Sequence, residues 1–337
     1  MTITPIHRRR VLVTGAGGFI GHHLVTHLKR QGAWVRGVDL KHPEYAATDA
    51  DEFLVRDLRR WENCLEATEG IDDVYALAAD MGGMGFISSH HAEILHNNIL
   101  ISTHTIEAAR QNGVSRYLYT SSACVYPEYR QTSIDVQPLK EEEAYPAQPQ
   151  DAYGWEKLVT ERLCTHYCED YGMDVRIVRF HNIFGPLGTW EGGREKAPAA
   201  MCRKVAIAKL TGNPEIEIWG DGEQTRSFCY IDDCVQGLQR LMDSTHREPL
   251  NLGQDRLISI NDLADMVART AGITITKRHI DGPQGVRGRN SNNDRLRQVL
   301  GWEPQVSLEL GIAKTYPWIQ AQVAKSLRER EVTSAVA

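Results

Sequence analysis

Residues 11–21 read VLVTGAGGFIG and are the strongest indication of the fold. The first residues of this stretch form the short apolar run of a strand that is buried on both faces. Gly15, Gly18 and Gly21 then permit a tight turn, close approach of backbone to a pyrophosphate, and packing of a helix on the strand. The helix that follows offers the free N–H groups and positive dipole end of its first residues, Phe19 and Ile20, to phosphates. The stretch therefore predicts a dinucleotide-binding turn.

Acidic residues follow the next two predicted strands. Residues 33–38 form the second strand and end at Asp39, at the spacing that the dinucleotide fingerprint requires. This carboxylate is expected to bind a ribose 2′-hydroxyl and repel a 2′-phosphate, which favours NAD over NADP. Asp57, after the strand at 52–56, is a further cofactor candidate. A glycine turn with a helix-capping acid and no ligand is the alternative, and the strand–turn–helix–strand context disfavours it.

Strand-like and helix-like segments alternate through the first half of the chain. Strands at 73–77, 117–120 and 175–180 are separated by helices at 91–111 and from 151 onward. This rhythm predicts an α/β fold, a Rossmann-type doubly wound parallel sheet with ligands beyond the carboxyl ends of its strands. Periodicity then becomes mixed, which predicts a smaller mixed α/β C-terminal substrate domain. The predicted divisions are a cofactor domain at 8–182 with a later contribution from about 225–250, a discontinuous substrate domain at 183–325, and a flexible tail at 326–337.

Composition limits the partners of the protein. The 337 residues carry a net charge of −6, which gives no support to a nucleic-acid or anionic-membrane partner. No apolar run approaches the roughly 18 residues of a membrane span. Seven cysteines, an odd number, favour reduced thiols over a disulfide framework, and their spacing completes no zinc site. These features predict a cytoplasmic protein without a metal.

A second group of residues suggests redox chemistry. Tyr153 and Lys157 are four residues apart and share one face of a predicted helix. A lysine beside a phenol stabilises phenolate and lowers its pKa from about 10 toward neutrality. That phenolate can accept an alcohol proton during hydride transfer, with Ser122 as a second hydrogen-bonding group. A chance pair on a solvated helix is the alternative, and the dinucleotide turn makes the catalytic interpretation the favoured one. Cys124, in the turn after the same strand, suggests chemistry beyond hydride transfer.

Cations gather in the second half of this acidic chain. If they converged, they could hold a diphosphate, although scattered surface charges are an equal alternative. They are Arg194, Lys196, Arg203, Lys204, Arg226, Arg287 and Arg289.

With these residues identified, the chain resembles the extended short-chain dehydrogenase/reductase family of nucleotide-sugar enzymes over nearly its whole length. The resemblance includes the glycine turn, Asp39, Ser122, Tyr153/Lys157, residues 179–186 and residues 220–226. Longer and less common strings resemble the members that epimerise GDP-hexoses. They are residues 79–86, 121–124, 192–198, 224–228 and 285–290.

The resemblance implies an NAD-dependent isomerase that inverts C3 and/or C5 of a GDP-hexose, converting GDP-mannose to GDP-L-galactose or GDP-L-gulose. Tyr153, supported by Lys157, would take the C4 hydroxyl proton as NAD takes the hydride. The 4-keto sugar would acidify C3 and C5, where Cys124 would act as base on one ring face and Lys196 as acid on the other. Hydride return would regenerate tightly bound NAD in each turnover.

The resemblance also implies the substrate contacts and an assembly. Contacts to the sugar and its phosphates would come from Gly82, Ser122, Ala123, Cys124, Asn182, Glu195, Lys196 and Ala197. The GDP portion would be held by Lys204, Gln224, Thr225, Arg226 and Arg289. A homodimer would form through the helices near 91–111 and 153–170.

Three other functions remain open. A 4,6-dehydratase needs a carboxylate pair after the strand-end serine, where this chain has Ala123 and Cys124. A C4-epimerase would leave Cys124 and Lys196 without a role. A non-catalytic NAD sensor would not need the set formed by Ser122, Tyr153 and Lys157.

Overall fold

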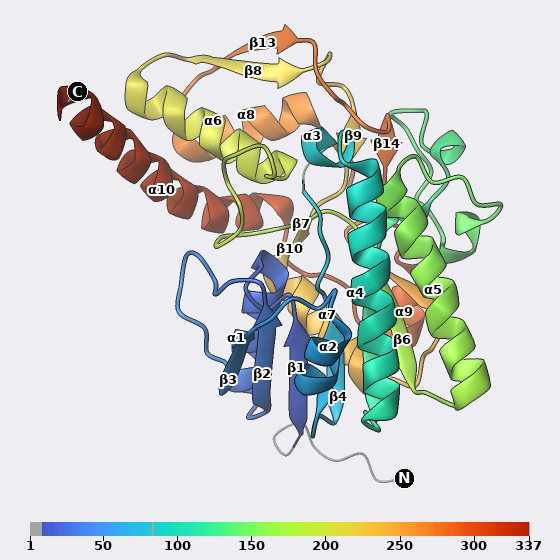
Figure 1. Cartoon of the computed structure of the whole chain (residues 1–337). Coiled ribbons are helices and arrows are strands. Elements are labelled where there is room, and N and C mark those ends of the chain that lie inside the picture. Colours follow the sequence, from blue (N-terminus) through green and yellow to red (C-terminus); the bar gives the residue numbers. More distant parts are fainter. Residues whose placement is uncertain (1–8, 83, 337) are drawn as a thin grey trace.

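Seven parallel strands form the central sheet of the protein, whose computed structural model describes residues 9–82 and 84–336 (Figure 1). The strand order is β11-β6-β5-β4-β1-β2-β3, so the direction of winding changes between β1 and β4. A ligand crevice is expected at that switch point, beyond the carboxyl ends of the strands. The predicted doubly wound α/β class is confirmed. The strands are β1 (Arg10–Thr14), β2 (Trp34–Asp39), β3 (Glu52–Val55), β4 (Asp73–Ala76), β5 (Arg116–Ser122), β6 (Val175–Phe180) and β11 (Pro249–Leu252).

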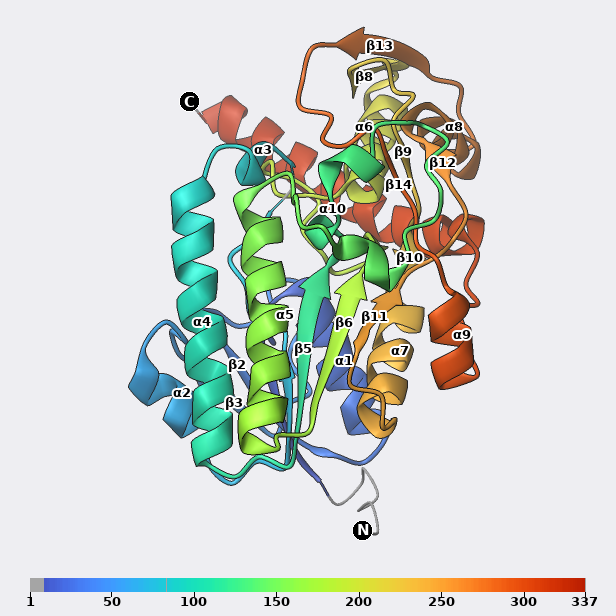
Figure 2. The ribbon, with the colours of Figure 1, turned by 90° about the vertical axis from the view of Figure 1, so that its right-hand side faces the viewer.

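Helices cover both faces of this sheet. Val11, Leu12 and Val13 of β1 are fully buried because side chains on each side of the strand meet a helix. Figure 2 shows α4 and α5 side by side on one face, where they pack on each other, and α1 and α7 on the other. These helices are α1 (Phe19–Arg30), α2 (Trp61–Thr68), α4 (His91–Gln111), α5 (Ala152–Tyr171) and α7 (Ile231–Asp243).

A smaller assembly of helices and short strands lies beyond the carboxyl ends of the sheet (Figure 1). Its mixed character agrees with the sequence expectation, while the domain boundaries themselves stay predictions. Its elements include β8 (Glu215–Trp219), which pairs with β13 (Thr276–Ile280), and β9 (Thr225–Arg226), which pairs with β12 (Ile258–Ser259) and β14 (Gly288–Arg289). The others are α3 (Met84–Ile87), β7 (Ile183–Phe184), α6 (Ala197–Thr211), β10 (Cys229–Tyr230), α8 (Ile260–Ala271) and α10 (Leu308–Val336). Helix α9 (Asp294–Leu300) instead lies beside β11, at the edge of the central sheet (Figure 2).

The last helix differs from the sequence expectation. A flexible tail was expected over 326–337, but α10 continues through Val336. Ile312, Tyr316, Ile319 and Val323 recur every three or four residues and are buried, so they anchor the helix on α6 and α8. Ala337 lies outside the described residues. Within the described part of the chain, every helix is too short or too polar to cross a membrane.

Candidate active site

The glycine turn after β1 has the geometry of a phosphate cradle. Gly15 has a φ of 69°, and a Cβ there would lie 3.0 Å from the Ala78 nitrogen. A Cβ on Gly21 would lie 2.1 Å from the Gly15 carbonyl oxygen, so helix α1 packs this closely only on glycine. Gly18 caps α1, whose first residues are Phe19 and Ile20. The backbone of this turn therefore fits the pyrophosphate of a dinucleotide.

Asp39, at the end of β2, is fixed against the same turn. Its carboxylate accepts hydrogen bonds from the backbone N–H of Gly17, at 3.0 Å, and of Leu40, at 2.6 Å. A Cβ on Gly17 would lie 2.1 Å from the Lys41 carbonyl oxygen, so this glycine is also required. The sequence interpretation did not single out Gly17, although it stands inside the fingerprint.

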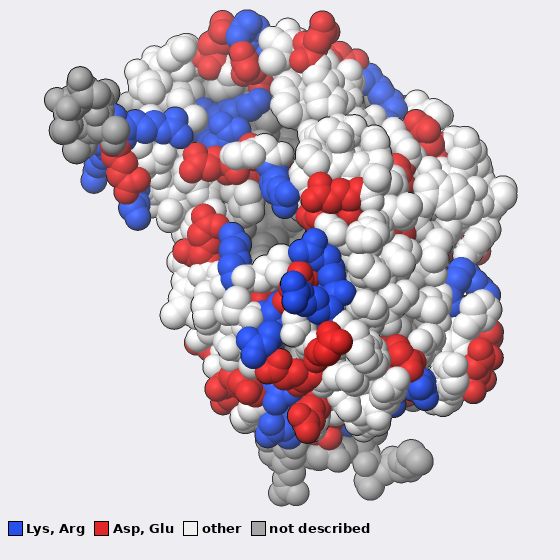
Figure 3. All heavy atoms as spheres, in the orientation of Figure 1, with Lys and Arg blue, Asp and Glu red and all other residues white. Residues whose placement is uncertain are grey.

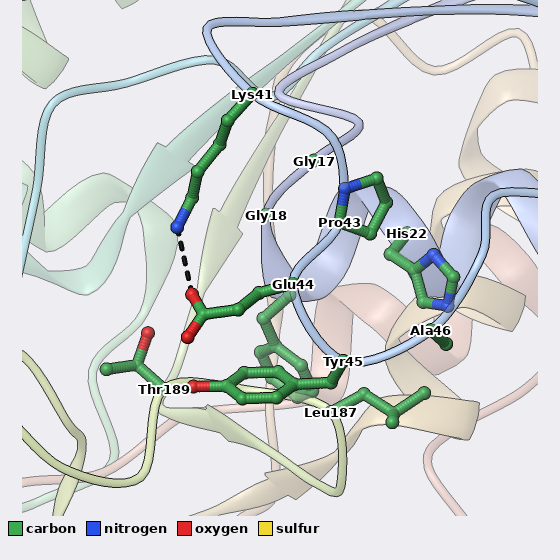
Figure 4. Close-up of a pocket in the computed structure, with 11 residues that line it drawn as sticks. Gly17, Gly18, His22, Lys41, Pro43, Glu44, Tyr45, Ala46, Leu187 and Thr189 are labelled. Atoms are coloured by element: carbon green, nitrogen blue, oxygen red, sulfur yellow. Dashed lines mark hydrogen bonds and ion pairs between the residues drawn. The ribbon is translucent and has the colours of Figure 1, made fainter.

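A hollow opens beside the glycine turn (Figure 4). Its walls are the glycine turn, the loop after β2 with its Lys41–Glu44 ion pair, and Leu187 and Thr189. Asp57, after β3, is paired with Arg59 at 2.8 Å, and hydrogen bonding to Arg59 lowers the pKa of Asp57. Asp39 and Asp57 lie at the carboxyl ends of the neighbouring strands β2 and β3.

The Tyr153–Lys157 pair lies near the start of α5. The helix begins where the Asp151 carboxylate accepts a hydrogen bond from the Gly154 N–H at 2.8 Å. Tyr153 is 6% exposed and Lys157 is 2% exposed. The Lys157 ammonium lies 5.5 Å from the centroid of the Tyr153 ring. Ser122 ends β5 beside them and is a hydrogen-bond partner of Tyr153.

The predicted lowering of the Tyr153 pKa does not hold in this structure. Burial raises that pKa well above its usual value, and the charges of Cys124, Glu156 and Asp151 act in the same direction. The hydrogen bond from Ser122 opposes them.

Cys124 lies in the turn that follows β5, in contact with a cation. The Arg289 guanidinium donates a hydrogen bond from Nη1 to the Cys124 sulfur at 3.3 Å. The Gln131 side chain orients Arg289, because its Oε1 accepts a hydrogen bond from Nε at 2.6 Å. A positive group against a thiol is the setting in which a cysteine can act as a base.

Lys196 immediately precedes α6 and interacts electrostatically with Cys124. Burial lowers the pKa of Lys196, and the positive charge of Arg289 lowers it further. The charges of Cys124 and Asp151 raise it. Arg226 belongs to the same group of charges, and burial followed by repulsion from Arg289 lowers its pKa to about 9. The fold thus brings Cys124, Lys196, Arg226 and Arg289 together from separate segments.

Several predicted substrate residues bind other parts of the protein. Asn182, with a φ of 46°, donates a side-chain hydrogen bond to the Ser227 carbonyl at 2.9 Å. Glu195 is paired with Arg203 at 2.8 Å. Ala197 begins α6, Ala123 is buried in the turn after β5, and Gly82 is buried against Phe86 and Arg194. Gly83, in one of the strings that carry the resemblance, lies outside the described residues.

The residues expected to hold GDP form a second group beyond the thiol. Lys204 donates to the Glu217 carbonyl at 2.5 Å, with its ammonium 5.9 Å from the Trp219 ring centroid. Gln224 donates to the Trp219 carbonyl at 3.2 Å, while its side-chain oxygen is buried without a partner among the described residues. Thr225 pairs with β14 beside Arg289.

Not all of the expected cations converge. Arg203 is paired with Glu195, and Arg287 is paired with Asp221 at 2.7 Å. Arg194 stacks on Phe86, 3.8 Å from the ring centroid, and lies 3.7 Å from an Asp80 oxygen. Figure 3 shows positive and negative side chains interspersed on this face of the molecule. Attraction of an anionic substrate would therefore be local to the cleft.

The glycine turn, the strand-end serine and the Tyr–Lys pair on a doubly wound sheet define a nicotinamide-dependent enzyme class. The sequence model of the NAD dependent epimerase/dehydratase family matches residues 11–253, and the chain belongs to this family. It is 52% identical to the GDP-mannose 3,5-epimerase of Arabidopsis thaliana, over 95% of this chain and 85% of that protein. It is 51% identical to GDP-mannose 3,5-epimerase 1 of Oryza sativa subsp. japonica, over 95% and 84%.

Solved structures agree with this family. The UDP-glucose 4-epimerase of Thermotoga maritima, determined with UDP-glucose, superposes with a TM-score of 0.84. It is 25% identical, and the match covers 93% of this chain and 99% of that one. The UDP-glucuronic acid 4-epimerase of Bacillus cereus, determined with UDP-glucuronic acid and NAD, gives a TM-score of 0.79 at 26% identity, over 93% and 99%.

Proposed function

We propose that this protein is an NAD-dependent isomerase that inverts C3 and/or C5 of GDP-mannose, giving GDP-L-galactose or GDP-L-gulose. The observation that carries the proposal is the Cys124 thiol in contact with Arg289, with Lys196 in the same group of charges. A C4-epimerase has no need of these groups, and a dehydratase would need carboxylates in their place. The two relatives named above, with 52% and 51% sequence identity to this chain, are GDP-mannose 3,5-epimerases.

Each side chain has a distinct task in this reaction. Bound NAD supplies the reversible hydride exchange at C4 that makes the sugar a 4-keto hexose. Tyr153 accepts the proton of the C4 hydroxyl and later returns it, while Ser122 orients that hydroxyl. Cys124 removes a proton from the carbon beside the ketone, and Lys196 delivers one from the opposite face. Two groups are needed because a single group would return the proton to the face from which it came.

The lowered pKa of Lys196 suits it to donate a proton near neutral pH. Arg226 and Arg289 would neutralise the diphosphate, with Lys204 and Gln224 farther along the GDP portion. Because the cofactor ends each turnover unchanged, we propose that NAD remains tightly bound between turnovers.

The protein is further proposed to be a cytoplasmic homodimer. All seven cysteines are free in the structure, which suits a reducing compartment. Helices α4 and α5 expose Leu95, Trp155 and Val159, which are 38%, 42% and 52% accessible. Large apolar side chains on two adjoining helices favour burial against a second copy.

The decisive experiment incubates the enzyme, NAD and GDP-mannose in deuterated water. The recovered sugar is analysed by NMR and mass spectrometry. Deuterium at C5 or C3 is expected, because inversion at those carbons requires exchange with solvent. Inversion at C4 without deuterium would instead identify a C4-epimerase, and an unchanged sugar would eliminate the proposal.

Cys124→Ala separates proton exchange from C4 oxidation. The variant should lose deuterium incorporation while NADH absorbance still appears transiently after GDP-mannose is added. Cys168→Ala is the matched control, because this half-buried thiol lies on α5 outside the site and should leave exchange intact. Loss of both oxidation and exchange in Cys124→Ala alone would assign the thiol a structural role.

A further inference from the structure

Glu156 is a fully buried carboxyl group beside the catalytic lysine. It precedes Lys157 on α5 and is 0% exposed. Its Oε1 accepts hydrogen bonds from the hydroxyls of Tyr119, at 3.2 Å, and Thr160, at 3.3 Å. Its Oε2 is buried and has no hydrogen-bond partner among the described residues. That second oxygen lies 3.9 Å from the Lys157 ammonium.

Lys157 lies between this carboxyl group and the catalytic tyrosine. Its ammonium is 4.8 Å from the centroid of the Tyr119 ring and 5.5 Å from that of Tyr153. A buried charge is strongly unfavourable unless an opposite charge compensates it. Among the described residues, Glu156 is the carboxylate within ion-pair distance of Lys157.

We propose that Glu156 is a positioning residue, the counter-ion that holds the Lys157 ammonium and thereby sets the pH at which Tyr153 exchanges its proton. The proposal rests on the function proposed above, in which Tyr153 must both accept a proton from C4 and return it within one turnover. The negative charge of Glu156 opposes that of Lys157 and so favours the protonated Tyr153 that must return the proton. A proton carrier works best when its two forms are close in free energy.

Other charged and titratable groups lie near Glu156, Lys157 and Tyr153, and the test must leave them unchanged. From the turn after β5 comes Cys124, and from α5 come Asp151 and Cys164. The nearby Glu161 is occupied by Arg179 of β6 at 2.6 Å. Glu107 of α4 lies farther along α5, where it pairs with Arg110 and accepts a hydrogen bond from Tyr167. Each of these remains unchanged when Glu156 becomes glutamine.

The test compares Glu156→Gln with the parent protein in two pH titrations. The first follows tyrosinate absorbance of the NAD-loaded protein, with Tyr153→Phe versions of both proteins to isolate the Tyr153 signal. The second follows transient NADH formation from GDP-mannose in a Cys124→Ala background, which removes the later proton exchange. Removing a nearby negative charge should move both midpoints to lower pH by about one unit.

Tyr119→Phe is the matched control, because it removes a hydrogen bond to Glu156 but keeps the carboxylate. Its midpoints should stay with those of the parent. Unchanged midpoints in Glu156→Gln, with a lowered melting temperature alone, would overturn the proposal and leave Glu156 a structural residue. An equal shift in Tyr119→Phe would also overturn it. If the parent forms no NADH from GDP-mannose, the proposed function fails, while the tyrosinate titration still decides the role of Glu156.

Discussion

Lys196 is the residue whose charge should limit the reaction at high pH. As a proton donor it must be protonated, and burial lowers its pKa below the usual value of about 10.4. Epimerisation should therefore fall as pH rises through that lowered value, which gives the alkaline limb of the pH profile. Lys196→Gln should reduce deuterium exchange by about 10²- to 10⁴-fold and leave residual activity without that limb.

The control for this change is Lys209→Gln. Lys209 lies on the same helix but donates to the Ala271 carbonyl at 2.7 Å, away from the thiol. Its pH profile should match that of the unmodified protein. An alkaline limb that persists in Lys196→Gln would assign the limb to another group.

Residue patterns suggested the candidate catalytic side chains but not the contacts that orient them. Tyr153 and Lys157 were identified because their spacing on a helix is local information. The contacts of Cys124 with Arg289, and of Arg289 with Gln131, depend on strands that meet only in the folded chain. Glu156 was missed for a similar reason, since a glutamate beside a lysine on a helix usually faces solvent.

At the scale of elements, α5 packs closely against the turn after β5 at Gly154. A Cβ on Gly154 would lie 2.2 Å from the Cys124 carbonyl oxygen. Gly154→Ala should therefore displace the helix or the turn, lowering the free energy of unfolding by about 1–3 kcal/mol. It should also slow deuterium exchange, because the thiol moves with its turn. Urea unfolding and the exchange assay measure the two effects.

A glycine at the other end of α5 provides the comparison. Gly172 caps the helix with a φ of 68°, and a Cβ there would meet open space. Gly172→Ala should cost about 1–2 kcal/mol through backbone strain alone and leave exchange unchanged. Equal loss of exchange in both variants would mean that stability, rather than the position of Cys124, controls activity.

Elements with strong local signals were predicted well, and those that depend on packing were not. The strand expected at 175–180 is present as β6, Val175–Phe180. The single helical turn α3 has too few residues to show a period. The helical conformation at the end of α10 was not predicted, because the residues beyond Leu327 are mostly polar and show no apolar period.

At the scale of the whole molecule, the parallel sheet brings one strand end after another to a common cleft. Alternating strands and helices predicted this arrangement, because parallel strands require crossover helices. The pairing of β9 with β12 and β14, which carries Arg226 and Arg289 toward Cys124, had no sequence signal. Strands of two residues are too short to be recognised by alternation.

The proposed dimer would form through the outer faces of α4 and α5. A stable dimer interface buries roughly 1,200–2,000 Å² in total, and adjoining helices of 21 and 20 residues offer a surface of suitable length. Val159→Glu would place an unpaired carboxylate in that interface, where desolvation is unfavourable by several kcal/mol. Analytical ultracentrifugation should show a dimer for the unmodified protein and monomers for the variant.

Leu310→Glu tests whether any exposed apolar residue would have the same effect. Leu310 is 49% accessible, similar to Val159, but lies on α10, outside the α4–α5 surface. This variant should remain dimeric, because its carboxylate stays in water. Monomers at all concentrations of the unmodified protein would refute the dimer. Dissociation by Leu310→Glu but not by Val159→Glu would move the interface to α10, which packs on α6 and α8.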